Sequence, residues 1–162
     1  MLRILLTGMS GTGKSTVLAA LAERGCATVE LDGAWCVPQP DGTQLWDEPR
    51  LTALLDRDDA RVLVVAGCEA NVSVFLPRFD RVILLTAPTP VILERLANRT
   101  TNAFGRTPEE CARVLRDIDE VEPRLRAVAH VEIDTSGPID QTVRRVLAQI
   151  PGDHPDVSSL EG

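Results

Sequence analysis

The sequence is poor in aromatic residues. Among its 162 residues there is no tyrosine, and there are only three phenylalanines and two tryptophans. Proteins that hold single-stranded nucleic acid by stacking gather aromatic side chains on one surface, so this composition argues against that class of ligand. No apolar run approaches the ~20 residues that a membrane-spanning helix needs. We therefore expect binding neither to nucleic acid nor to a membrane.

Cysteine is also scarce. The four cysteines are Cys26, Cys36, Cys68 and Cys111, and they form neither a C-x-x-C pair nor a zinc-ligand spacing. A single arginine precedes the first apolar run, which is not the pattern of a signal peptide. We therefore expect reduced thiols and a cytoplasmic protein.

Positive charge is in short supply. There are 17 basic residues against 24 acidic ones, which gives a formal net charge of −7. That balance argues against non-specific binding to nucleic acid or to anionic lipid, but one basic pocket in an acidic protein can still hold a small anion. The length predicts a single domain over residues 1–150, followed by a flexible polar tail over 151–162. A monomer and a homodimer both remain open.

Glycine, by contrast, is concentrated in one stretch, "GMSGTGKST", over residues 8–16. Clustered glycines lose much backbone freedom on folding, so they need a reason such as positive φ or close approach to a ligand. The stretch matches G-x-x-x-x-G-K-[ST] with Gly8, Gly13, Lys14 and Ser15. An apolar run precedes it and a helical pattern follows it, which is the context that a phosphate-binding loop requires.

In such a loop, consecutive backbone N–H groups wrap a polyphosphate. We expect Lys14 to reach the β- and γ-phosphates and the Ser15 hydroxyl to hold Mg²⁺. The predicted nucleotide contacts from this stretch are Gly8, Ser10, Gly11, Thr12, Gly13, Lys14, Ser15 and Thr16.

Apolar runs alternate with helical patterns along the rest of the chain. This alternation predicts an α/β fold in three layers, with a five-stranded parallel sheet between helices on both faces. Pro123 should kink or break a long helical stretch over 107–129. The predicted strands cover 2–7, 27–31, 61–67, 81–87 and 130–134, and the predicted helices cover 14–24, 48–57, 89–99, 107–129 and 137–150.

Acidic residues at strand ends identify the metal side of the expected site. Only the second predicted strand delivers them, through Glu30 and Asp32 in "VELD". Alternate positions on a strand share one face, so Asp32 is expected beside the phosphates and the metal. The other interpretation is that Asp32 initiates the turn "LDG". Glu30 is interpreted as a sheet-face or surface carboxylate.

The chain resembles the small-molecule kinases of the P-loop class, the group that contains shikimate kinase, gluconate kinase and adenylate kinase. The segments that carry the resemblance are "GMSGTGKST", "VELD", "ERLANRTTNAFGR" and "IDTSGP". It implies an ATP- and Mg²⁺-dependent transfer of phosphate to a small-molecule acceptor, on a five-stranded parallel sheet with a short mobile lid.

The resemblance also implies roles for individual residues. Asp32 would help to hold Mg²⁺ or accept the acceptor's proton. Arg99 and Arg106, in a lid over residues 95–108, would close over the transferring phosphoryl group, with Arg95 sharing the task. The loop after the last strand would pack on the adenine through Ser136, Gly137 and Pro138. The alternative for each arginine is a solvated surface charge.

The acceptor region is expected over 33–60, where Trp35 and Trp46 either stack on a ring or pack in the core. Gly67 would permit close approach of the acceptor and Asn71 would donate to it. "GCEA" stands where shikimate kinases carry a glycine triplet, which argues against shikimate. The acceptor stays open among a nucleoside, a nucleoside monophosphate, a sugar-like alcohol and an antibiotic.

Two other functions fit the same motifs. No aspartate ends the third or fourth predicted strand, where motor and switch ATPases carry one. That absence allows a nucleotide-binding module without transferase activity. A simple nucleoside triphosphatase without a small-molecule acceptor is the other possibility.

Overall fold

The computed structural model describes residues 1–100 and 105–151. Its main sheet has five parallel strands in the order β2-β5-β1-β6-β7, so the first strand of the chain lies in the middle. Each strand falls within a range that the sequence predicts, and the predicted α/β class is confirmed. The strands are β1 (Leu2–Thr7), β2 (Ala27–Glu30), β5 (Val62–Ala66), β6 (Arg81–Thr86) and β7 (Val131–Asp134).

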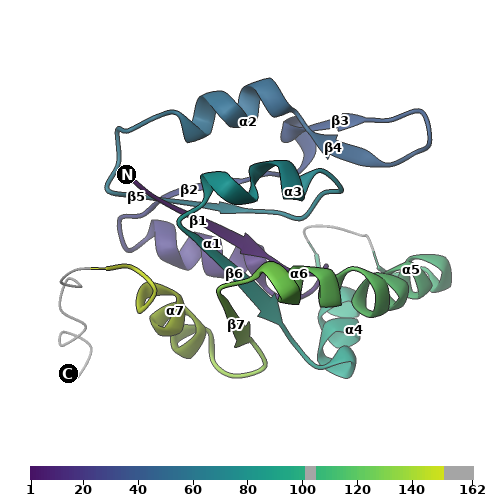
Figure 1. Cartoon of the computed structure of the whole chain (residues 1–162). Helices are drawn as coiled ribbons and strands as arrows, with labels where there is room; N and C mark the ends of the chain where they lie inside the picture. The colour runs from purple at the N-terminus through teal and green to yellow at the C-terminus, as the bar shows by residue number, and fades with distance from the viewer. Residues whose placement is uncertain (101–104, 152–162) are drawn as a thin grey trace.

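Helices cover both faces of this sheet (Figure 1). Ile4 and Leu6 of β1 pack in one core with α1 (Lys14–Ala22) and α7 (Ile139–Leu147). Leu5 points to the opposite face and packs with α2 (Glu48–Leu55) and α3 (Val72–Phe75). This alternation of apolar side chains to both faces is why the strands read as continuous apolar runs.

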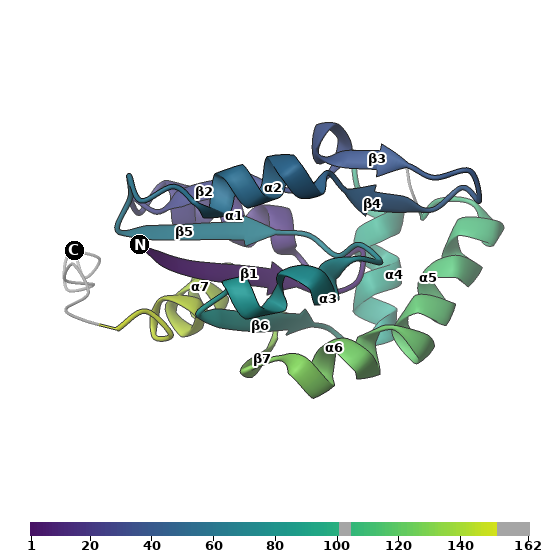
Figure 2. The ribbon, with the colours of Figure 1, turned by 45° about the horizontal axis from the view of Figure 1, so that its top comes forward.

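Two further helices, α4 (Thr89–Asn98) and α5 (Pro108–Glu120), lie toward the carboxyl ends of the strands, as Figure 2 shows. Thr107 and Glu110 form a capping box that starts α5. The prediction that Pro123 breaks the helix is confirmed, because α5 ends at Glu120 and α6 (Glu122–Val128) begins separately.

An antiparallel hairpin that the sequence did not predict follows a short 3-10 turn, Gly33–Trp35. Its strands are β3 (Cys36–Pro38) and β4 (Gln44–Trp46). Trp46 is 1% exposed, and its indole N–H donates to the Leu31 carbonyl over 3.1 Å. Trp46 therefore belongs to the core and does not stack on a ligand. A Cβ on Gly67 would lie 3.1 Å from its ring, so that glycine accommodates Trp46, not the acceptor.

Asn71 joins the hairpin to the main sheet. Its side-chain carbonyl accepts from the Trp46 N–H over 3.0 Å. Its amide donates to the Trp46 carbonyl over 3.1 Å and to Glu48 over 3.2 Å. The expectation that Asn71 donates to the acceptor is wrong, because this buried amide is fully used in fixing the hairpin.

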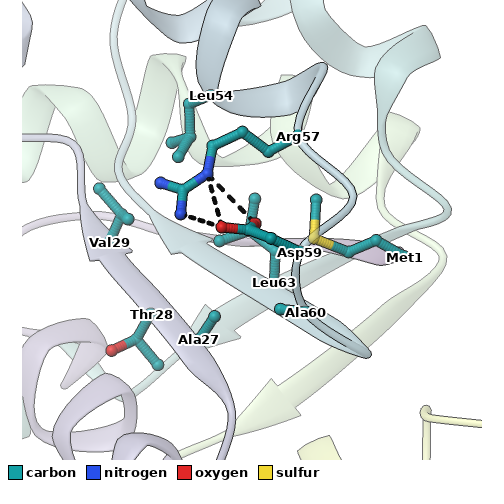
Figure 3. Close-up of a pocket in the computed structure, with 9 residues that line it drawn as sticks. All are labelled: Met1, Ala27, Thr28, Val29, Leu54, Arg57, Asp59, Ala60 and Leu63. Atoms are coloured by element: carbon teal, nitrogen blue, oxygen red, sulfur yellow. Dashed lines mark hydrogen bonds and ion pairs between the residues drawn. The ribbon is translucent and has the colours of Figure 1, made fainter.

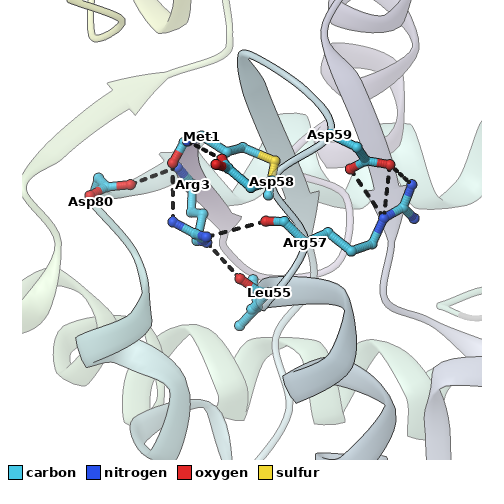
Figure 4. Close-up of polar contacts among 7 residues, drawn as sticks. All are labelled: Met1, Arg3, Leu55, Arg57, Asp58, Asp59 and Asp80. Atoms are coloured by element: carbon cyan, nitrogen blue, oxygen red, sulfur yellow. Dashed lines mark hydrogen bonds and ion pairs between the residues drawn. The ribbon is translucent and has the colours of Figure 1, made fainter.

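A cluster of polar contacts lies where β1 begins, at the end of the sheet away from the glycine loop (Figure 4). The Arg3 guanidinium donates to the carbonyls of Leu55, Met1 and Arg57 over 2.7, 3.1 and 3.3 Å. The terminal ammonium of Met1 pairs with Asp58 over 2.6 Å. These bonds join the start of β1 to the chain that follows α2.

Beside this cluster of polar contacts lies a cavity of about 270 Å³ at the edge strand β2 (Figure 3). An exposed ion pair between Arg57 and Asp59 forms part of its wall. In the described part of the chain, no helix is both long enough and apolar enough to cross a membrane.

Candidate active site

The loop between β1 and α1 has the backbone geometry that only glycine adopts at low cost. Gly8, Gly11 and Gly13 have φ angles of 144°, 84° and 91°. A Cβ on Gly8 would lie 2.3 Å from the Leu85 carbonyl oxygen, so the loop packs directly on β6. The glycines of the motif are therefore explained by backbone conformation and by close packing together.

Lys14 begins α1 and turns its side chain back into the loop. Its ammonium donates to the carbonyls of Gly8 and Met9 over 2.6 and 3.0 Å. Burial lowers the pKa of Lys14, and the charge of Asp32 opposes that shift. The loop thus holds a positive charge at its centre, where a bound anion would meet it.

Ser15 lies beside Glu30 at the mouth of the loop. The Ser15 hydroxyl donates to the Glu30 carboxylate, which stands at the last residue of β2. Glu30 was interpreted as a surface carboxylate, and it lines the cavity together with Ser15. Its alternate position with Asp32 in "VELD" was the signal for this placement, since both residues face the same side.

Asp32 follows β2 and precedes the 3-10 turn. Its side chain makes no capping hydrogen bond to that turn, which disfavours the interpretation of Asp32 as a turn initiator. Burial raises the pKa of Asp32, while the ammonium of Lys14 opposes the shift and Glu30 adds to it. A carboxylate held beside a lysine is suited to metal binding or proton transfer.

A cavity of about 860 Å³ opens along the loop, within the size range of small-ligand sites. Its walls come from the glycine loop, α1, the end of β2, α4, and the segment from β7 into α7. Predicted site residues that line it are Ser10, Gly11, Gly13, Lys14, Ser15, Thr16, Asp32, Arg95, Arg99 and Gly137. Residues that the sequence did not select are Val17, Glu30, Asn98, Thr135, Ile139 and Thr142.

Five predicted residues are not among those that line the cavity. Gly8 lies behind the loop against β6, and the Thr12 hydroxyl is buried and donates to the Met9 carbonyl over 2.8 Å. Pro138 stands at the N-cap of α7. The structure therefore gives these three residues a part in shaping the site, behind its surface.

The other two are Ser136 and Arg106. The Ser136 N–H and hydroxyl are both engaged by Asp134, in a local turn. Arg106 is exposed, and its N–H donates to Glu110 over 3.1 Å at the start of α5. The expected lid over residues 95–108 includes 101–104, which lie outside the described residues, as do 152–162 of the expected tail.

Arg95 of α4 and Arg99, the residue after α4, have different surroundings. Arg95 donates through one guanidinium nitrogen to the Gly11 carbonyl over 3.2 Å and to the Thr135 hydroxyl over 2.9 Å. Arg99 lies just past the end of α4. Burial lowers the pKa of Lys14 and the charge of Arg99 adds to that shift, whereas burial raises the pKa of Asp32 and the charge of Arg99 opposes that shift. Arg99 therefore adds positive charge to the same space as Lys14.

These groups fit a nucleoside triphosphate with Mg²⁺. Backbone amides, an ammonium and a guanidinium suit phosphate oxygens, while the Ser15 hydroxyl and the carboxylates of Glu30 and Asp32 suit a hard cation. Across 1–100 and 105–151, no three His, Cys, Asp or Glu side chains gather as a metal site.

A third carboxylate, Glu69, lies near Asp32 on the side of the hairpin. Burial and then the charge of Asp32 raise the pKa of Glu69, which follows β5. The Cys36 thiol donates to Glu69 over 3.7 Å, and burial followed by the Glu69 charge raises the pKa of Cys36 to about 11. Nearby, the Arg50 guanidinium lies 4.0 Å from the centre of the Trp35 ring. Trp35 is thus already stacked by a cation of its own chain.

Comparison with known proteins places the chain in a family. The family model described as "AAA domain" matches residues 4–116, which include the glycine loop, Asp32, Arg95 and Arg99. The chain belongs to the AAA domain family. A search of curated proteins finds no match to this AAA domain.

Three solved structures that are similar to this AAA domain are named as small-molecule kinases. Shikimate kinase from Acinetobacter baumannii in complex with shikimate superposes with a TM-score of 0.67 and 23% identity, over 91% of each chain. A gluconokinase from Sinorhizobium meliloti 1021 gives 0.58 and 27%, over 91% of this chain and 90% of the other. A sugar kinase from Janibacter sp. HTCC2649 gives 0.59 and 20%, over 91% and 93%. The fold is therefore that of the P-loop small-molecule kinases.

Proposed function

We propose that this AAA domain is a phosphotransferase that moves the γ-phosphoryl group of Mg·ATP to a hydroxyl of a small acceptor. One observation carries the proposal. Lys14, Asp32 and Arg99 line a single cavity at the glycine loop. An anion-binding loop, a carboxylate that could act as a base and a guanidinium therefore share one space. The similarity to kinases of known structure supports the same reaction class.

The loop amides and Lys14 would bind the β- and γ-phosphates. Lys14 now donates to the Gly8 and Met9 carbonyls, so it exchanges these partners for phosphate oxygens on binding. Ser15, with Glu30 and Asp32 behind it, would hold Mg²⁺. When bound, Mg²⁺ neutralises charge on the phosphate oxygens.

Asp32 would accept the proton of the acceptor hydroxyl. The hydroxyl oxygen would bond to the γ-phosphorus while the bond from that phosphorus to the β–γ bridging oxygen breaks. Arg99 would stabilise the negative charge that spreads over the transferring group. Arg106 would join it only if the segment around the expected lid brings it inward. Exclusion of water by that segment would favour transfer over hydrolysis.

The charges on the hairpin side indicate which acceptors suit the site. Burial and then the charge of Asp32 raise the pKa of Glu69, so the acceptor side would carry two carboxyl groups. An acceptor with its own carboxylate or phosphate near the reacting hydroxyl would be repelled. We therefore favour an uncharged or cationic alcohol, such as a nucleoside, a sugar-like alcohol or an antibiotic, over a nucleoside monophosphate.

The test is an acceptor screen with Mg·ATP, followed as ADP release and as phosphate transferred to the acceptor. We expect transfer with the native protein, and at least a hundredfold loss in Lys14→Ala, since one transition-state cation is removed. Arg144→Ala, on the exposed part of α7, is the matched control. ADP release without any acceptor would indicate a triphosphatase, and binding without release would indicate a nucleotide-binding module.

A further inference from the structure

A buried hydroxyl at the wall of the cavity, beside the glycine loop, joins three parts of the site. Thr135, the residue after β7, is 5% exposed. Its hydroxyl oxygen lies 2.8 Å from the Thr12 carbonyl and 3.1 Å from the Thr86 carbonyl, and its N–H donates to the Thr86 carbonyl over 2.8 Å. The hydroxyl proton serves one carbonyl at a time, and that of Thr12 is nearer.

Arg95 completes this contact from α4. One of its nitrogens donates to the Thr135 hydroxyl over 2.9 Å and to the Gly11 carbonyl over 3.2 Å. The other donates to the Thr135 carbonyl. Gly13 lies directly against the pair, because a Cβ there would be 3.9 Å from Arg95 and 4.0 Å from the Thr135 hydroxyl. Two consecutive carbonyls of the loop therefore accept hydrogen bonds, that of Gly11 from Arg95 and that of Thr12 from Thr135.

Holding a carbonyl also fixes the N–H of the same peptide unit. The unit is planar and trans, so its C=O and N–H point in opposite directions. The Thr12 carbonyl and the Gly13 N–H belong to one peptide unit. A hydrogen bond from Thr135 to that carbonyl therefore aims the Gly13 N–H away from Thr135. A loop of N–H groups binds phosphate only while those groups converge on it.

We propose that Thr135 is a positioning residue of the phosphate site, which orients the Gly13 N–H through the Thr12 carbonyl. Thr135 is also the first residue of the loop that is expected to pack on the adenine. It therefore connects the adenine-binding loop to the phosphate-binding loop. The inference rests on the proposed function only in requiring that the cavity binds a polyphosphate.

The experiment compares two probes, Mg·ATP and inorganic tripolyphosphate with Mg²⁺, by titration calorimetry. Thr135→Val keeps the shape of the side chain and removes the hydroxyl. We expect both probes to bind about tenfold more weakly, since a buried carbonyl and a guanidinium each lose a partner. Thr135→Ser keeps the hydroxyl and should bind both probes within about twofold of the native protein. Thr28→Val, on β2 at the other cavity, is the matched control.

The outcomes separate the two proposals. If the native protein binds neither probe, the proposed function fails. If the native protein binds both and Thr135→Val binds both equally well, this inference alone is overturned. It is also overturned if Thr135→Val loses affinity for ATP and keeps its affinity for tripolyphosphate. The hydroxyl would then affect only the binding of the adenosine part of ATP.

A measurement on the native protein covers the case in which Thr135→Val does not fold. The amide proton of Gly13 should move downfield in a ¹H–¹⁵N spectrum when tripolyphosphate and Mg²⁺ are added. A Gly13 resonance that stays in place at saturation would contradict the proposed orientation of its N–H.

Discussion

Lys14 is the only lysine in the chain, and the loop that it serves surrounds it. Sixteen of the 17 basic residues are therefore arginines, whose charge does not titrate in the physiological range. Burial makes the ammonium of Lys14 less favourable, whereas an anion in the loop would favour it. Its protonation thus reports directly on the occupancy of the site.

Reductive methylation with ¹³C-formaldehyde should give two sets of signals, from Lys14 and from the amino terminus. We expect the pKa of Lys14 to lie below its ordinary value of 10.5, so that the ammonium loses its proton at a lower pH than a free lysine does. Added Mg²⁺ and tripolyphosphate should move this pKa upward. The terminal signals, at Met1 on the opposite end of β1, are the internal control. A Lys14 pKa that phosphate leaves unchanged would argue against its role.

Gly8 tests the close packing of the loop on β6. In Gly8→Ala the new Cβ would meet a backbone oxygen at 2.3 Å with φ at 144°. We expect a loss of about 2–4 kcal/mol in the free energy of unfolding from crowding and strain, together with loss of nucleotide binding. Gly25→Ala has φ at 83° with nothing within 4 Å, so it should cost only about 1–2 kcal/mol. Urea unfolding measures both, and equal losses would show that crowding contributes nothing.

At the scale of elements, the hairpin β3–β4 is held to the sheet by few groups. Trp46 fills a gap above Gly67, and the Asn71 amide satisfies both backbone groups of Trp46. The hairpin itself pairs only three residues in each strand. Its position over the acceptor side of the site therefore depends on these contacts more than on its own ladder.

Asn71→Ala should lower the free energy of unfolding by about 1–3 kcal/mol, because the buried N–H and C=O of Trp46 lose their partners. The expected catalytic consequence is a higher KM for the acceptor with little change in the KM for ATP. Glu48→Gln keeps an oxygen for the Asn71 amide and should stay within about 0.5 kcal/mol of the native protein. Urea unfolding and steady-state kinetics check both variants, and a native-like Asn71→Ala would refute the anchoring role.

At the scale of the whole molecule, the parallel sheet places the carboxyl ends of β1, β2 and β7 along the same edge, the one formed by the strand ends. The glycine loop, the carboxylates and Thr135 come from segments that are far apart along the chain, and they meet there because β1 lies in the centre of the sheet. Parallel doubly wound sheets bind their ligands beyond such an edge. The net charge of −7 is thus compatible with an anion site, because Lys14, Arg95 and Arg99 all line the cavity at this edge.

A ligand that binds only the folded state raises the free energy of unfolding of the whole domain. At Mg·ATP concentrations about 100 times the dissociation constant, the gain is about 2.7 kcal/mol. For a chain of this length that corresponds to a rise of roughly 5–10 °C in Tm. Removal of Mg²⁺ with EDTA should reverse most of the rise, as measured by calorimetry. No change in Tm at millimolar Mg·ATP would remove the foundation of the proposed reaction.

Much of this arrangement was predictable from local sequence. The phosphate-loop motif, the five apolar strands and the break at Pro123 each depend on neighbours within a few residues. The hairpin was missed because its strands are three residues long and carry no strict alternation. Gly67 and Asn71 were assigned to the acceptor because their packing against Trp46 has no signature in a single segment.

The sequence by itself determined the glycine loop with its lysine and serine, and the alternation of strands and helices, because backbone conformation and periodicity are local properties. Only the tertiary structure decided which side chains support that loop. Thr135 holds a carbonyl 123 residues away in the chain, and Arg95 reaches the same loop from α4. Such contacts depend on the order of strands in the sheet, which no local pattern specifies.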